Sequence, residues 1–170
     1  MASKEMDEYI SYPTTFIEDA GTSLKTALKT ARKFGALKAD LLPFKGKMVT
    51  LQESKYLKTA GKLKVKAYFN LAKTKKNKLE MFKAWIHYRG PILTFLNCDE
   101  SWFQIKKDGK LEKYIKNNYQ QGHAVSIVGY TPTHFIIRNS WGERWGDKGF
   151  AYATYAYTEK AFNEAYGIVV

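Results

Sequence analysis

The residues with the clearest chemical potential are His123 and Asn139, at opposite ends of a predicted β-hairpin. Two stretches with apolar runs, residues 122–130 and 135–146, flank a Thr-Pro-Thr turn at residues 131–133. Antiparallel pairing would place His123, at the start of the first strand, beside Asn139, at the end of the second. A histidine held by an asparagine amide suits a general base, because the amide fixes its tautomer and orientation. The alternative is that His123 is a satisfied structural residue.

The sequence around these two residues resembles the papain-like cysteine peptidases. The matching pieces are Gly-His-Ala-Val and Val-Gly-Tyr within residues 122–130, and Arg-Asn-Ser-Trp-Gly-Glu-Arg-Trp-Gly-Asp-Lys-Gly-Phe at residues 138–150. The resemblance implies that His123 is the base of a Cys-His-Asn triad and that Asn139 orients it. It also implies that Trp141 covers their contact from water. The fold implied is α+β and papain-like but truncated, with an antiparallel barrel-like sheet lobe and a helical remnant of the first lobe.

The third member of such a triad, the cysteine nucleophile, has no counterpart where the family carries it. That cysteine lies roughly 130–150 residues before the histidine, and counting back from His123 passes Met1. Three interpretations stay open: a fragment or subunit completed by another chain, a pseudo-peptidase retained as a binding module, or a substitute nucleophile at Cys98. Cys98 is the sole cysteine, and the alternative is that it is an inert small apolar residue. We therefore expect absent or very weak catalysis by this chain alone.

The rest of the chain is consistent with the end of a first lobe followed by a complete second lobe. Thr22 or Ser23 is suited to cap a helix that begins near Leu24, and Gly35 is suited to end it. The domains expected are residues 1–45, the first-lobe remnant and crossover, and residues 46–170, the second lobe. Apolar periodicity predicts further helices at 51–57, 79–87 and 159–165, and strands at 62–69, 92–96, 150–155 and 166–170.

Resemblance to the family also assigns residues to the substrate cleft. The strand at 92–96 borders the cleft in these enzymes, and an aromatic residue and a glutamine follow it, as Phe103 and Gln104 do here. We therefore expect Gln104, Cys98 and Trp141 to line the cleft, and a peptide or protein to be the substrate. No metal or cofactor is expected.

The net charge of +12 is concentrated in one third of the chain. Residues 25–78 contain 16 Lys and Arg against 2 acidic residues, or +14, whereas the remainder carries 12 basic and 14 acidic residues. Such a field attracts anionic partners, although a solvated, solubilising surface is the alternative. Further partners expected are the missing nucleophile-bearing chain or a copy of this chain.

Cysteine content and hydropathy limit where the chain is expected to act. A single cysteine allows no intrachain disulfide, which favours a reducing compartment such as the cytoplasm. The first eight residues contain no apolar signal core, and no run reaches the roughly 20 apolar residues of a membrane span. The sequence assigns no further location.

Overall fold

The computed structural model describes residues 22–38, 40–41, 53–73, 75–116 and 121–170. The chain divides into two compact units, Met1–Tyr68 with Val169–Val170, and Phe69–Ile168. The boundary expected between residues 45 and 46 lies outside the described residues and stays a prediction. Among the described residues no helix is long and apolar enough to cross a membrane.

The first unit contains two helices, α2 (Leu24–Lys33) and α3 (Glu53–Ala60). The predicted cap is confirmed, because the Ser23 hydroxyl accepts a hydrogen bond from the Thr26 N–H at 3.1 Å. The stop at Gly35 is confirmed too: its φ is +97°, and a Cβ there would lie 1.8 Å from the Ala60 carbonyl oxygen. Only glycine fits that position.

The strand predicted at 62–69 is wrong over most of its length, since strand β1 comprises only Ala67–Asn70. Two of the preceding residues, Leu63 and Val65, pair with the end of α2, whereas the Lys66 N–H donates to the Val169 carbonyl at 2.8 Å. The Ala36 N–H donates to the Leu63 carbonyl at 3.0 Å, and the Val65 N–H donates to the Ala31 carbonyl at 3.3 Å. Helix-end carbonyls need such partners, and here they override the alternating pattern of the sequence.

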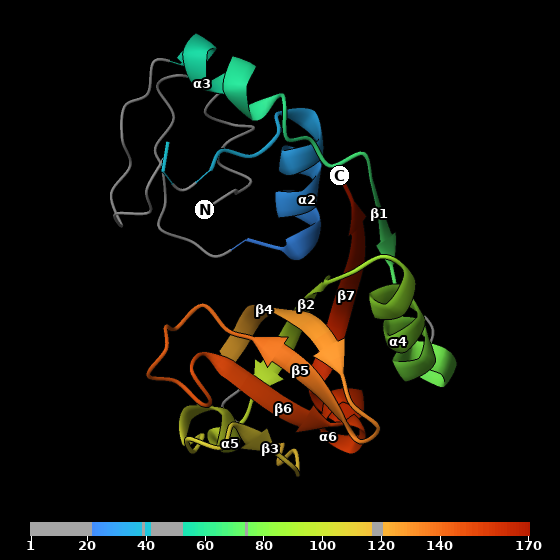
Figure 1. Cartoon of the computed structure of the whole chain (residues 1–170). Coiled ribbons are helices and arrows are strands. Elements are labelled where there is room, and N and C mark those ends of the chain that lie inside the picture. Colours follow the sequence, from blue (N-terminus) through green and yellow to red (C-terminus); the bar gives the residue numbers. More distant parts are fainter. Residues whose placement is uncertain (1–21, 39, 42–52, 74, 117–120) are drawn as a thin grey trace. The chain divides into compact units, whose positions relative to one another are not determined.

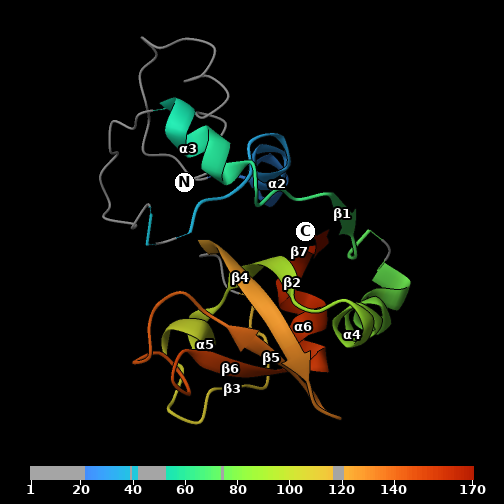
Figure 2. The ribbon, with the colours of Figure 1, turned by 45° about the horizontal axis from the view of Figure 1, so that its top comes forward.

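A seven-stranded sheet has the order β1-β7-β2-β4-β5-β6-β3 (Figures 1 and 2). Neighbours run antiparallel in the pairs β2–β7, β2–β4, β4–β5 and β5–β6, and β3 runs parallel to β6. This sheet, combined with a few helices, confirms the predicted α+β class. The remaining strands are β2 (Ile92–Cys98), β3 (Lys110–Leu111), β4 (Gln121–Tyr130), β5 (His134–Arg138), β6 (Phe150–Thr154) and β7 (Phe162–Val169).

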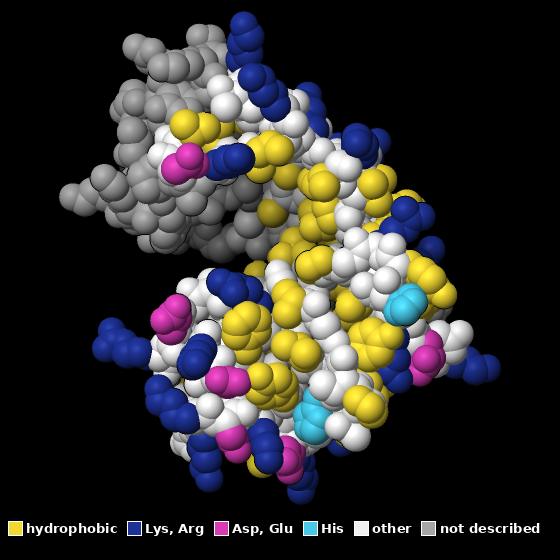
Figure 3. All heavy atoms as spheres, viewed as in Figure 1, with side chains coloured by type: hydrophobic (Ala, Val, Ile, Leu, Met, Phe, Trp, Pro, Cys, Tyr) yellow, Lys and Arg dark blue, Asp and Glu magenta, His cyan; other side chains and the backbone are white. Residues whose placement is uncertain are grey.

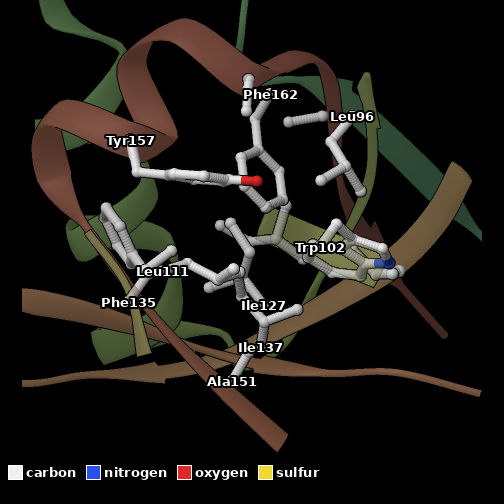
Figure 4. Packing of buried hydrophobic residues seen from close by; sticks show 14 of the residues in the cluster. Leu96, Trp102, Leu111, Ile127, Phe135, Ile137, Ala151, Tyr157 and Phe162 are labelled. Carbon is white, nitrogen blue, oxygen red and sulfur yellow. The ribbon is translucent and has the colours of Figure 1, made fainter. Parts of the chain in front are cut away.

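The core of the second unit lies on one face of these strands. In β2 every second residue is buried, namely Ile92, Thr94, Leu96 and Cys98, as the period of a strand requires. Helices α4 (Lys78–Tyr88) and α6 (Tyr155–Ala161) add Phe82 and Tyr157, both fully buried. Figure 4 shows Leu96 and Tyr157 in one cluster with Trp102, which comes from the short helix α5 (Glu100–Phe103). A 3-10 turn, η1 (Lys75–Asn77), precedes α4.

The helix predicted at 159–165 is wrong, because α6 begins and ends four residues earlier. Thr154 caps it, accepting a hydrogen bond from the Tyr157 N–H at 3.1 Å. The buried Lys78 ammonium stabilises the C-terminal end of α6. It donates hydrogen bonds to the carbonyl oxygens of Thr158, Glu159 and Phe162 at 3.3, 2.6 and 3.0 Å. The last strand therefore starts at Phe162, whereas helix 79–87 and strands 92–96 and 150–155 are confirmed within two residues.

Candidate active site

The hairpin of β4 and β5 brings His123 and Asn139 into contact. The Thr131 N–H closes the turn by donating to the His134 carbonyl at 2.8 Å. His123 lies near the start of β4, Asn139 follows the last residue of β5, and the His123 Nε2 atom is 2.8 Å from the Asn139 Oδ1 atom. The geometry expected from the sequence is present.

A second hydrogen bond determines which nitrogen of His123 carries the proton. Asn139 Oδ1 also accepts from the Ser140 backbone N–H at 2.8 Å, and a backbone N–H can only donate. The side-chain atom facing His123 is therefore the amide oxygen, so His123 Nε2 must be the donor. In the neutral ring this leaves Nδ1 as the acceptor, the atom that a general base uses to take a proton.

Trp141 lies against the imidazole, as the resemblance implies. Its ring centroid is 4.8 Å from that of His123 with an interplanar angle of 38°. Trp141 is 43% exposed, whereas Asn139 is 7% exposed. The indole thus separates solvent from one face of the imidazole, and its outer surface stays open. The Asn139 Nδ2 atom is buried and has no hydrogen-bond partner among the described residues.

A residue that the sequence reasoning missed, Trp102, also reaches the site. Its ring is fully buried, with its centroid 5.9 Å from His123 and 4.7 Å from Trp145. The Trp145 indole N–H donates to the Trp102 carbonyl at 3.1 Å, which joins α5 to the loop after Asn139. The sequence feature that could have indicated Trp102 is its position directly before Phe103 and Gln104.

The two residues of the expected aromatic-glutamine pair, Phe103 and Gln104, make different contacts. Phe103 stacks on Trp141, with ring centroids 5.8 Å apart and planes 27° apart, and it is 51% exposed. Gln104 is exposed too, but its amide donates to the Glu100 carboxylate at 2.6 Å. Contact with the open face of Trp141 therefore comes from Phe103, and the placement of Gln104 along a cleft stays a prediction.

Cys98 ends β2 with its side chain in the hydrophobic core, 1% exposed. Burial, together with the neighbouring Asp99 carboxylate, raises the pKa of its thiol from 9.0 to about 12. In the register of β2 and β4, Cys98 lies opposite Gln121, and Leu96 lies opposite His123. The thiol is therefore neutral and enclosed, as an inert apolar residue would be.

Two cavities in the described part of the chain are lined by residues other than the His-Asn pair. A cavity of about 510 Å³ is lined by Lys78, Tyr114 and residues of α6 and β7, and another of about 430 Å³ lies beside Gln104 and β3. No group of three or more His, Cys, Asp or Glu residues in the described ranges is placed to hold a metal ion.

Comparisons with a family model and with related sequences indicate the same protein family. The family model described as papain family cysteine protease matches residues 18–167. An uncharacterized peptidase C1-like protein of Acanthamoeba polyphaga mimivirus is 29% identical over 82% of this chain and 48% of its own length. Cathepsin K of Mus musculus is 29% identical over 77% of this chain and 40% of its own length. The chain thus spans less than half of either relative.

Solved structures share the fold at low sequence identity. Xylellain, a cysteine protease from Xylella fastidiosa, is 20% identical with a TM-score of 0.70, over 98% of this chain and 69% of that one. Procathepsin L 3 of Tenebrio molitor larval midgut is 17% identical with a TM-score of 0.67, over 89% and 49%.

Proposed function

Because this chain belongs to the papain family of cysteine proteases, we propose that it supplies the histidine and asparagine of a Cys-His-Asn site for peptide-bond hydrolysis. The observation that carries the proposal is the 2.8 Å contact between His123 Nε2 and Asn139 Oδ1, which leaves Nδ1 as the acceptor. The substrate is a peptide or a protein, as the family implies. The nucleophilic thiol comes from outside these 170 residues.

In the proposed reaction His123 moves one proton in each half. Nδ1 accepts the proton of the incoming thiol, and the thiolate sulfur attacks the scissile carbonyl carbon. The resulting imidazolium returns the proton to the leaving amine, which yields an acyl-thioester. In the second half Nδ1 takes a proton from water, and the hydroxide attacks the thioester carbonyl carbon. The carbon–sulfur bond then breaks, the imidazolium returns the proton to the departing sulfur, and the acyl group is released as a carboxylic acid. Asn139 Oδ1 accepts the Nε2–H bond in every step, so the ring keeps its orientation.

Cys98 does not take this role in the proposal. A thiolate nucleophile needs a lowered pKa and access to the substrate, and the Cys98 thiol has a pKa of about 12 and 1% exposure. A chain with a functional His-Asn pair and an enclosed thiol should be inactive alone. Activity then depends on a sulfur that is delivered to His123 Nδ1 from another segment.

Complementation tests the proposal. The purified chain is incubated with a fluorogenic peptide, alone and with a cysteine-bearing first-lobe segment of a papain-family relative fused ahead of Met1. We expect no turnover by the chain alone, and turnover by the fusion that His123→Ala abolishes and Asn139→Ala reduces. Rapid turnover by the chain alone that Cys98→Ser abolishes would refute the proposal and make Cys98 the nucleophile.

A second candidate function is the recruitment of an anionic partner by the first unit. Lys25, Lys29 and Arg32 are exposed on α2 at a spacing of four and three residues, which places them on one face of the helix. The helix contains no acidic residue. Figure 3 shows Lys and Arg side chains projecting from the described surface of this unit. A positive face of this kind attracts polyanions through a long-range field.

Elution from a heparin matrix tests this second function. The double variant Lys25→Glu, Lys29→Glu should elute at clearly lower salt than the wild type, because two contacts with the polyanion become repulsive. The matched control, Lys106→Glu with Lys110→Glu, makes the same change of charge at exposed positions of the second unit. Equal elution of the two double variants would leave only the solubilising interpretation.

A further inference from the structure

We propose that Trp102 is a positioning residue for His123, a buried wall that keeps the imidazole in the orientation in which Nε2 meets Asn139. The inference rests on the proposed role of His123 as the base. It assigns a function to a buried side chain that lies outside the Asn-Ser-Trp-Gly segment.

The two indoles near His123 meet its ring from adjacent sides. The ring centroids of His123, Trp141 and Trp102 form a triangle with sides of 4.8, 5.9 and 6.3 Å. Those lengths exclude a sandwich, in which the two indoles would lie farther apart. Trp141 covers the ring from the solvent side, and Trp102, at 65° to the imidazole plane, closes the side toward the core. If the imidazole rotated toward the core and broke its hydrogen bond to Asn139, it would clash with the ring of Trp102.

Trp102 is itself held by bonds on both sides of its backbone. Its N–H donates to the Asp99 carbonyl at 3.1 Å, and its own carbonyl accepts the Trp145 indole N–H. The Asp99 carboxylate is fully buried and accepts hydrogen bonds from the Ser101 hydroxyl, the Ile115 N–H and the Tyr157 hydroxyl, at 2.6, 2.9 and 2.8 Å. A satisfied polar network of this kind fixes the start of α5, and with it the ring of Trp102.

The indole contributes its shape rather than its N–H group. Trp102 Nε1 is buried and has no hydrogen-bond partner among the described residues, so this N–H group adds no bond that would hold the ring. In Figure 4 the ring lies at one edge of the core cluster, and Tyr157 lies at the other. Phenylalanine at this position would keep much of the wall and remove the unpaired donor. Leucine or alanine would open space beside the imidazole.

The test is nitrogen-15 NMR of the His123 ring in the full chain, which needs no turnover. The readouts are the tautomer and the exchange rate of the Nε2 proton with solvent. Wild type should show an Nε2–H tautomer with slow exchange, and a wild type without it would refute the His-Asn proposal itself. Trp102→Ala and Trp102→Leu should speed exchange at least tenfold and mix the tautomers, whereas Trp102→Phe should stay close to wild type.

A matched control separates positioning from general loss of stability. Phe82 is equally buried, with its ring 5.9 Å from Phe135, so Phe82→Ala also removes a core aromatic ring. We expect this variant to lose stability and to keep the His123 tautomer and slow exchange. If it changes the His123 signals as much as Trp102→Leu does, or if folded Trp102→Leu and Trp102→Ala keep wild-type signals, the inference is overturned. Should the alanine variant fail to fold, the leucine variant decides.

Discussion

Alkylation of Cys98 separates an inert thiol from a substitute nucleophile most directly. At pH 8 a thiol with a pKa of 9.0 is about one tenth ionised, whereas a pKa of about 12 leaves about one in ten thousand ionised. Since the thiolate is the reactive form, this difference alone slows reaction with iodoacetamide by about a thousandfold. The 1% exposure of Cys98 slows it further, because the reagent must wait for the core to open.

The assay is mass spectrometry of the intact chain after timed exposure to iodoacetamide, with and without urea. We expect no modification of the folded chain on a timescale in which the urea-unfolded chain is fully alkylated. Cys98→Ser serves as the control for labelling at other residues. Native reaction faster than that of the unfolded chain, slowed by His123→Ala, would refute the reasoning and indicate a Cys98–His123 pair.

The same raised pKa predicts how stability depends on pH. Below pH 9 the thiol is protonated in both the folded and the unfolded chain, so its contribution to stability is fully present. Between pH 9 and 12 the unfolded thiol ionises first, and this contribution is lost as the pH rises. At pH 10 the loss is about 1.4 kcal/mol. Urea denaturation at pH 7 and pH 10 measures this loss. Between the two pH values the free energy of unfolding should fall by about 1.4 kcal/mol more in the wild type than in Cys98→Ala.

Three further substitutions test the packing around the site, each by urea denaturation. Lys78→Met should lower the free energy of unfolding by about 2–4 kcal/mol, because three carbonyl oxygens at the end of α6 lose a charged donor; an unchanged midpoint would contradict this role. Tyr157→Phe should lower it by about 1–2 kcal/mol, since the buried Asp99 carboxylate loses one of its hydrogen bonds. Gly122→Ala should lower it by about 1–3 kcal/mol, because a Cβ would lie 2.2 Å from the Phe95 ring, and added Phe95→Leu should restore part of the loss.

The site was predictable where local rules determine geometry. A two-residue period and a short turn are enough to place His123 and Asn139 at neighbouring strand ends, and the 2.8 Å contact confirms that placement. Residues 62–66 show where such rules fail. Their alternating pattern is that of a strand, but Leu63 and Val65 pair with the end of α2, a long-range partner that periodicity does not reveal.

Two other features depended on tertiary contacts that the sequence does not encode locally. Thr154 and Thr158 are both suitable caps, and the structure uses Thr154, with Thr158 buried and its hydroxyl donating to the Thr154 carbonyl. The contact between Trp102 and His123 joins α5 to β4 across 21 residues, and no motif marks it. Sequence patterns therefore predicted the contact between His123 and Asn139, whereas the contact between Trp102 and His123 is seen only in the packing of the structure.

The separation of His123 and Asn139 along the chain has a consequence for assembly. They are 16 residues apart on a single hairpin, so the loop that must close to join them is short. Hairpins form in about 1–10 μs, far faster than two chains associate at cellular concentrations. Under the proposed function, the pairing of His123 with Asn139 would thus not depend on a partner, and another segment would need to bring only a sulfur atom within reach of Nδ1.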